Sequence, residues 1–388
     1  MSDSTWYTSE DVRLADYLEI VTAETDPADY PLAERIEQEV LVYDGERLAR
    51  ASGTASGRRE VQGELARALK DGPGLVVFKR AFTDTKVVDL ATDAFVTMIE
   101  AQRATGAVSG DHFAKPGAND RVWNALEKLA VDAPEVFVEY YGNDVIALVS
   151  EAWLGPAYQI TSQVNVVNPG GEAQSPHRDY HLGFQTDESA MDYPRHVHRL
   201  SPVLTLQGAV AHTDMPVVSG PTMYLPHSQK YEPGYLAWRR PEFIDHFDEH
   251  HVQLPLDKGD AAFFNPALFH GAGTNRSSDI RRMANLLQVS SAFGRAMESV
   301  DRERMCNAIF PALLAVRADR SDGRSLANAV AACAEGYSFP TNLDRDQPVG
   351  GLAPETQSQL LARAVAEGWD AAALQKELAS YAERRRTS

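Results

Sequence analysis

The sequence predicts a mainly β protein with additional helices, whose core is an antiparallel jelly roll (a double-stranded β-helix). Three observations support this fold class. Strand patterns follow one another from residue 158 to residue 291 with no regular helical pattern between them. Helical spacing of apolar residues precedes them, and Ala-, Leu- and Glu-rich helical patterns follow after residue 295. Strands that return to one site in this way are typical of two facing antiparallel sheets.

The composition is ordinary for a soluble globular enzyme. The chain has 388 residues, of which 44% are hydrophobic and 24% charged, and its formal net charge is −18. An excess of acidic residues argues against binding to nucleic acid or to anionic membranes, because both need a basic surface. The two cysteines indicate no disulfide framework. Without a signal-peptide pattern or a long apolar run, we expect a cytoplasmic protein.

Three parts are expected along the chain. Residues 1–57 form an N-terminal segment, which ends in a small and polar stretch, 51–57, with the composition of a linker or mobile loop. Residues 58–294 form the jelly-roll domain with its packing helices. Residues 295–388 form the helical C-terminal extension, which could pack on the barrel, cover the substrate mouth or mediate a homodimer.

The elements are assigned from periodicity and from breaker residues. Gly72 and Pro73 end one of the expected helices. Helices are expected at 9–23, 58–70, 84–104, 120–130, 143–153, 302–317, 324–334 and 354–367. Strands are expected at 75–78, 158–168, 203–213, 222–225, 261–269 and 281–291.

The strand at 158–168 alternates, with Gln163 and Asn165 on its polar side. A solvent-facing strand would give this pattern. Alternatively, the polar side lines a cavity, where Gln163 and Asn165 would contact a co-substrate.

The motif that carries chemistry is His177-Arg178-Asp179. On an extended strand, residues two apart point to the same face, so the side chains of His177 and Asp179 can converge on one metal ion. A surface loop is the commoner meaning of an isolated His-x-Asp. Arg178 alternates to the other face and is expected to be structural.

A third ligand is expected from His270, and the three side chains would then form the facial triad of non-haem Fe(II) oxygenases. Arg281 follows at the start of the last expected strand, which would carry its guanidinium into the same cavity. Arginine grips a carboxylate with two parallel hydrogen bonds. An iron triad with a buried arginine suggests an acidic co-substrate, and 2-oxoglutarate fits.

Other polar residues near the motif are candidates for substrate contacts. His181 shares the expected strand face of the two ligands and is assigned to substrate or ligand support rather than to the metal. Tyr180, His112 and Lys115 are further candidates for binding a small or cationic metabolite. Residues 182–200 lack periodicity and form either a lid over the substrate or a surface excursion. His212, on an apolar strand, is expected to be a core histidine.

These blocks together resemble the phytanoyl-CoA dioxygenase family of Fe(II)/2-oxoglutarate-dependent oxygenases. The resemblance spans about residues 64–292. It rests on five blocks, namely 71–79, 177–179, 219–228, 258–270 and 275–282. One turn departs from the family pattern, since Pro-Gly-Ser-His is usual there and this chain has Pro226-His227-Ser228-Gln229.

The resemblance implies that His177, Asp179 and His270 bind Fe(II) and that Arg281 binds the far carboxylate of 2-oxoglutarate. It implies hydroxylation of an unactivated C–H bond by O2, with release of succinate and CO2. Halogenation is disfavoured because family halogenases have a small residue in place of the aspartate. Two alternatives stay open: a non-redox jelly-roll metalloenzyme (a hydrolase or isomerase), and an inactive barrel that serves as a scaffold.

Overall fold

The computed structural model describes residues 5–104, 118–319 and 323–387. Its strands form one eight-stranded sheet in the order β1-β2-β3-β8-β6-β10-β5-β4 and one small sheet of β7 and β9. The strands are β1 (Arg35–Glu37), β2 (Val40–Asp44), β3 (Leu75–Lys79), β4 (Asn119–Val122), β5 (Gln159–Val167), β6 (Thr205–Ala211), β7 (Met223–Leu225), β8 (Ala261–Phe264), β9 (Phe269–Gly271) and β10 (Arg282–Ser290).

Helices make up more of the chain than strands do. The α-helices are α1 (Leu14–Val21), α2 (Gly45–Ala51), α3 (Ala55–Lys70), α4 (Lys86–Ala104), α5 (Ala125–Asp132), α6 (Pro134–Tyr141), α7 (Asp144–Leu154), α8 (Asp187–Met191), α9 (Arg195–Leu200), α10 (Pro241–His250), α11 (Arg302–Asp319), α12 (Gly323–Cys333), α13 (Gln357–Glu367) and α14 (Ala371–Arg385). Of the helices described, none combines the length and apolar composition needed to cross a membrane.

The two sheets face each other as the two layers of a jelly roll, which confirms the predicted fold class. In the large sheet only the β2–β3 pair is parallel. The small sheet is extended by isolated bridges that pair His177 with His270 and Tyr224 with Val252. Apolar side chains from both layers, including Val77, Phe264 and Leu256, form one core cluster between the sheets.

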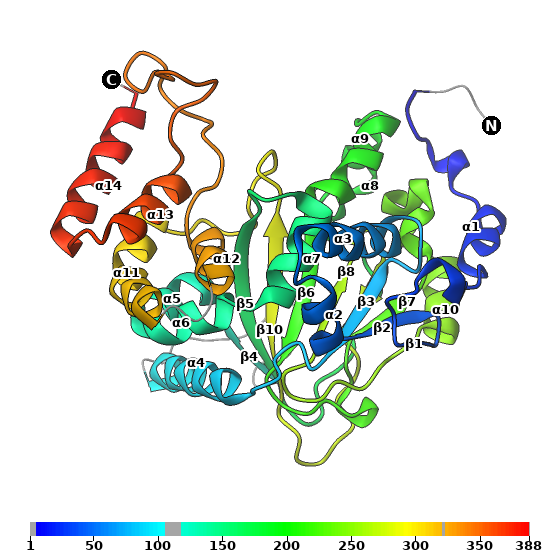
Figure 1. Ribbon diagram of the computed structural model, residues 1–388. Helices are drawn as coiled ribbons and strands as arrows, with labels where there is room; N and C mark the ends of the chain where they lie inside the picture. Colours follow the sequence, from blue (N-terminus) through cyan, green and yellow to red (C-terminus); the bar gives the residue numbers. More distant parts are fainter. Residues whose placement is uncertain (1–4, 105–117, 320–322, 388) are drawn as a thin grey trace.

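Helices cover the outer face of the large sheet (Figure 1). Helices α3, α5, α7 and α12 contact its strands directly. Ile160, Val164 and Val289 of the sheet belong to the same apolar cluster as residues of these helices. The side of β5 that carries Ile160 and Val164 therefore packs into the apolar core against the helices, in keeping with its alternation.

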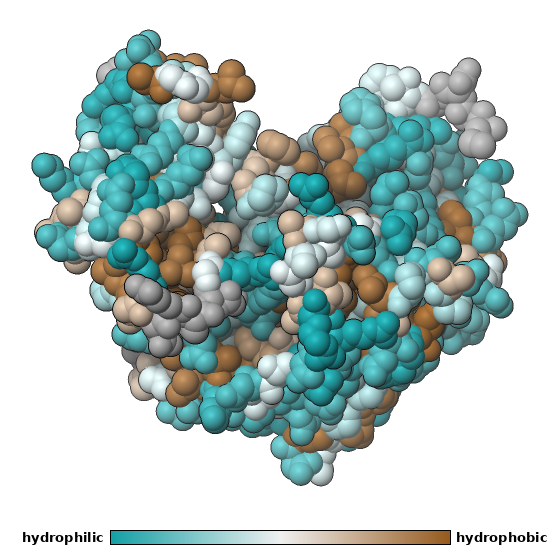
Figure 2. Space-filling model, viewed as in Figure 1, coloured by the Kyte–Doolittle hydropathy of each residue, from teal (hydrophilic) through white to brown (hydrophobic). Residues whose placement is uncertain are grey.

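The C-terminal helices belong to this core as well. Helices α11 and α12 contact α6, and Ile309 and Val330 join the large apolar cluster. Cys306 and Cys333 are free thiols within it, with their sulfur atoms 3.7 Å apart. Figure 2 shows a mostly hydrophilic surface, with a notch between the C-terminal helices and the part of the molecule that carries α9.

The N-terminal segment is built into the domain rather than preceding it. Tyr7, Val12 and Tyr17 pack with Phe269 of the small sheet and with α10, and β2 pairs with β3 in the large sheet. Of residues 51–57, expected as a linker or mobile loop, 52–54 form a tight turn and the others belong to α2 and α3. The Thr54 side chain caps α3 by accepting a hydrogen bond from the Gly57 amide, which explains the small polar composition.

Other elements differ from the prediction for tertiary reasons. Residues 119–122, of which 120–122 were expected to begin a helix, form the edge strand β4 because they pair with β5. The single strand expected at 261–269 is divided between β8 in the large sheet and β9 in the small one. This crossing between layers places His270 opposite His177.

Candidate metal centre and cavity

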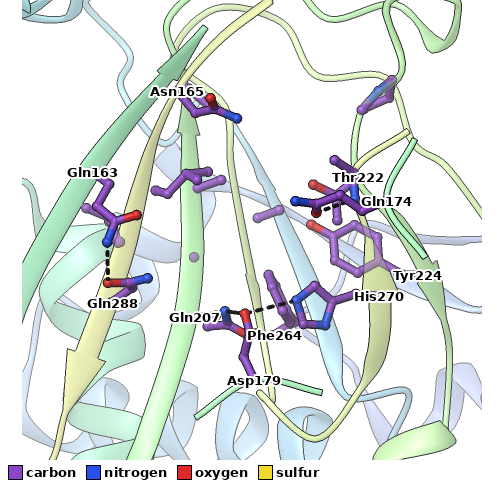
Figure 3. A pocket seen from close by; sticks show the side chains of 18 of the residues that line it. Gln163, Asn165, Gln174, Asp179, Gln207, Thr222, Tyr224, Phe264, His270 and Gln288 are labelled. Carbon is purple, nitrogen blue, oxygen red and sulfur yellow. Dashed lines mark hydrogen bonds and ion pairs between the residues drawn. The ribbon is translucent and has the colours of Figure 1, made fainter. Parts of the chain in front are cut away.

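A cavity of about 420 Å³ lies between the two sheets. Its large-sheet wall carries amide side chains, including Gln163, Asn165, Gln207 and Gln288, and the opposite wall carries Tyr224 and His270 (Figure 3). Apolar side chains fill the rest of the lining, among them Leu75, Val77, Val167, Phe184, Met215, Leu254, Leu256, Phe264 and Met297. An apolar cavity with a few convergent polar groups is the usual form of a small-molecule site.

His177, Asp179 and His270 meet at the wall of this cavity. Their ligand atoms all lie within 4.8 Å of one another, and theirs is the one such group among the described residues. His177 Nε2 is 3.6 Å from Asp179 Oδ1, and His270 Nε2 is 3.4 Å from Asp179 Oδ2. The backbones of His177 and His270 exchange two hydrogen bonds, which fixes the rings side by side.

Hydrogen bonds set the ring tautomers for metal binding. The Nδ1 of His177 lies 3.0 Å from the Ser175 carbonyl, and that of His270 lies 2.9 Å from the Leu268 carbonyl. A carbonyl only accepts, so each Nδ1 carries a proton, which leaves Nε2 of each ring as the atom that can bind a metal.

Asp179 is held as a carboxylate. Gln207 donates to one of its oxygens. Although burial opposes ionisation, His177, His270 and Gln207 together hold the pKa of Asp179 well below its usual range. Two imidazole nitrogens and one ionised carboxylate on one side of a cavity fit Fe(II), because the remaining coordination positions face the open space.

Gln163 and Asn165 line the cavity, as the second interpretation of the strand pattern predicted. Gln163 accepts a hydrogen bond from Arg121 and donates to Gln288. The side-chain oxygen of Asn165 has no partner among the described residues. Their contact with a co-substrate stays a prediction.

Arg281 does not enter the cavity. Its side chain is 52% exposed and its guanidinium pairs with Asp120 and Asn168 at the sheet edge. The cavity is instead lined by Arg282, because β10 begins at this residue and side chains alternate from there along the strand. The expectation that Arg281 enters the cavity is therefore not met, and the adjacent Arg282 lines it instead.

Arg282 is buried, and burial lowers its pKa to about 10. It therefore remains charged at neutral pH. No hydrogen bond or ion pair joins its guanidinium to another described side chain. A buried charge is costly unless it is paired, so Arg282 suits a ligand that brings an anionic group into the cavity.

Tyr180 and His181 do not line the cavity. Both have positive φ angles, 61° and 39°, so the chain turns away after Asp179 and the strand alternation ends there. His181 Nδ1 lies 3.1 Å from the Ser201 hydroxyl, and Tyr180 is buried against His181 and Phe184. His112 and Lys115 lie outside the described residues.

Residues 182–200 contain the short helices α8 and α9, which the sequence did not indicate. Arg195 of α9 pairs with Asp11 of the N-terminal segment at 2.7 Å. Phe184 lines the cavity while remaining 55% exposed, which places it at the mouth. A lid role for this segment stays a prediction.

Two further histidines have structural roles. His212 is buried, with Nδ1 2.8 Å from the Thr92 hydroxyl and Nε2 2.9 Å from the Tyr140 hydroxyl, as expected for a core histidine. His227 stands where the family pattern has glycine, and its φ of 68° keeps the left-handed turn that glycine adopts freely. Its ring contacts Thr25 and Gly72 instead of the cavity.

The fold and the site define a jelly-roll protein with a His–Asp–His group that could hold a metal ion. The sequence model of the phytanoyl-CoA dioxygenase (PhyH) family matches residues 53–283. The chain therefore belongs to the phytanoyl-CoA dioxygenase family, and the resemblance drawn from its motifs is confirmed. No curated protein matches the sequence.

Several solved structures are similar to this chain. One is the non-haem α-ketoglutarate-dependent epimerase SnoN from nogalamycin biosynthesis, at 19% identity over 62% of this chain and 84% of that chain, with a TM-score of 0.41. EvdMO1 is 18% identical over 60% of this chain and 50% of that chain, with a TM-score of 0.43. AviO1 from Streptomyces viridochromogenes is 16% identical over 60% of this chain and 96% of that chain, with a TM-score of 0.43.

Proposed function

We propose that this protein is an Fe(II)- and 2-oxoglutarate-dependent dioxygenase that hydroxylates an unactivated C–H bond of a small-molecule metabolite. The observation that carries the proposal is the pairing of two features in one cavity. The His177–Asp179–His270 group is preorganised for a metal, and the cationic Arg282 lies in the same cavity with no carboxylate partner from the described chain.

Each residue of the site has a proposed role that follows from its chemistry. His177 and His270 would hold the iron through Nε2, and Asp179 through its carboxylate, oriented by Gln207. Arg282 would pair with the far carboxylate of 2-oxoglutarate. The apolar lining excludes water from the reacting atoms. In net terms the substrate C–H, O2 and 2-oxoglutarate give the alcohol, succinate and CO2, and the bound iron supplies the oxidising chemistry.

The cavity also bears on the substrate. Its described lining has the cationic side chains of Arg121 and Arg282 and a single carboxylate, Asp179. That balance does not favour the cationic metabolite considered from the net charge alone. The amide side chains of Gln163, Asn165 and Gln288 suit a neutral substrate that carries hydrogen-bonding groups.

The test is an anaerobic titration of Fe(II) and 2-oxoglutarate, followed by the weak visible charge-transfer band of the iron–2-oxo acid chelate. We expect the band in the wild type and in Arg281→Ala. Arg282→Ala should need about 10- to 100-fold more 2-oxoglutarate, because a hydrogen bond to a charged group contributes about 1.5–3 kcal/mol. The two variants remove the same side chain from adjacent residues on opposite faces, so each is the control for the other.

Other outcomes of this titration would favour a different function or a different arginine. Iron binding without a band would favour a non-redox metalloenzyme, a hydrolase or an isomerase. Failure to bind iron would favour a scaffold protein. A loss of 2-oxoglutarate affinity in Arg281→Ala alone would restore the assignment made from the sequence motif.

A further inference from the structure

Arg178 lies between the two metal-binding residues of the His177-x-Asp179 motif and points away from the cavity. It is among the largest fully buried side chains in the described chain. Its Nη2 donates to the carbonyl of Ser228 at 2.7 Å and to that of Tyr231 at 2.9 Å. No carboxylate forms an ion pair with it among the described residues.

The surroundings are shaped to accept the guanidinium. It lies 5.1 Å from the ring centre of Tyr235 and 5.2 Å from that of Phe269. A Cβ atom placed on Gly234 would be only 2.0 Å from Cζ of Arg178. Glycine is therefore required at position 234 for the guanidinium to occupy this place.

The same contacts connect the two segments that carry metal ligands. The Ser228 carbonyl accepts from Arg178, and the Ser228 hydroxyl accepts from the Phe269 amide at 2.8 Å. Phe269, which also packs against the guanidinium, directly precedes His270. The loop of His177 and Asp179 is thus tied through Arg178 and Ser228 to the strand of His270.

Burying this cation is unfavourable for stability by itself. The guanidinium of Arg178 is fully buried and no carboxylate of the described residues forms an ion pair with it. Replacing a buried ionic group by an apolar side chain of similar volume is often neutral or stabilising. Stability alone therefore does not account for a cation at this position, whereas its link between the two ligand-bearing segments does.

We propose that Arg178 is a positioning residue, which holds the two ligand-bearing segments in register from behind the cavity and thereby sets the affinity for the metal. The inference rests on the metal site of the proposed function. It assigns Arg178 no contact with metal, co-substrate or substrate. Its role is comparable to that of the outer-shell groups that orient metal ligands.

The test compares Arg178→Met with Arg302→Met. Arg302 is also buried and also donates to main-chain carbonyls, those of Cys333, Ala332 and Ile160, but it lies outside the cavity. Fe(II) affinity is measured anaerobically by competition with a chromophoric chelator, at a temperature where both variants are folded. We expect the dissociation constant to rise about 10- to 100-fold in Arg178→Met and to stay close to the wild-type value in Arg302→Met.

Gly234→Ala provides a second test that leaves every ligand and the arginine itself in the sequence. Its new methyl group displaces the guanidinium, so Fe(II) affinity should fall in the same direction. If Arg178→Met does not fold, the result for Gly234→Ala decides. The inference is overturned if the Arg178 or Gly234 variant binds Fe(II) like Arg302→Met. If the wild type itself fails to bind Fe(II), the proposed function falls as well.

Discussion

The two faces of the large sheet use polar residues in opposite ways. On the helix-covered face, buried polar groups are joined to one another, as in Ser162 with Tyr141 at 3.0 Å and His212 with Tyr140 at 2.9 Å. On the cavity face, the side-chain oxygens of Asn165 and Gln207 have no partner among the described residues. Asn285 Oδ1 on the helix-covered face is unsatisfied as well, but the oxygens of Asn165 and Gln207 belong to residues that line the cavity, where a ligand could satisfy them.

The largest expected effect is a loss of metal binding on the cavity face with little loss of stability. Asp179→Ala removes the only carboxylate of the metal group, so Fe(II) binding should weaken by more than about 100-fold and turnover should be lost. Because no helix-face contact changes, the thermal midpoint of the metal-free protein should fall by no more than about 4 °C. Calorimetry and chelator competition measure the two quantities. A metal-free variant that unfolds far earlier would show that the cavity face also carries stability.

On the helix-covered face, His212 should make stability depend on pH. Burial lowers its pKa from 6.5 to about 3. Between these values the unfolded state binds a proton that the folded state does not, so the free energy of unfolding decreases as the pH falls. The loss is about 1.4 kcal/mol for each pH unit in that window.

In His212→Gln the slope of unfolding free energy against pH should be shallower by this amount, as measured by urea titrations between pH 6 and pH 4.5. The carboxylates that titrate in the same range are common to both proteins and cancel in the difference. Equal slopes would mean that His212 takes up its proton without unfolding the chain.

The smallest effect compares adjacent residues of β5. Val164 faces the helices and Asn165 the cavity. Val164→Ala should cost about 2 kcal/mol of stability because it leaves a void in the core, with Fe(II) and 2-oxoglutarate affinity unchanged. Asn165→Ala should leave stability within about 0.5 kcal/mol and alter ligand binding. Chemical denaturation and the charge-transfer titration would detect a reversal of this pattern.

The sequence predicted what depends on local periodicity. The alternation of β5 put Gln163 and Asn165 on one side, with solvent or a cavity as the two interpretations, and the structure shows the cavity. His177, Asp179 and His270 were assembled from their motifs. Period-two patterns survive folding because the strand geometry is the same everywhere.

The prediction failed where the backbone at one residue changed the side to which the neighbouring side chains point. The positive φ of Tyr180 ends the alternation and removes His181 from the site, and the start of β10 at Arg282 turns Arg281 outward. Residue type does not reveal either change. Tyrosine is uncommon at positive φ, so Tyr180 does not indicate a turn, and Arg281 and Arg282 are identical neighbours. Pairing with β5 likewise overrode the helical pattern at residues 119–122.

The packing of the N-terminal segment has a practical consequence for trimming this protein. The family match begins at residue 53, yet Tyr17 lies against Phe269, with ring centres 5.4 Å apart, and β1 and β2 are strands of the large sheet. A fragment cut to the matched range would expose Phe269 and unpair β3 along one edge. The shortest fragment that retains this packing around the candidate metal site therefore starts well before residue 53, at or before Tyr7.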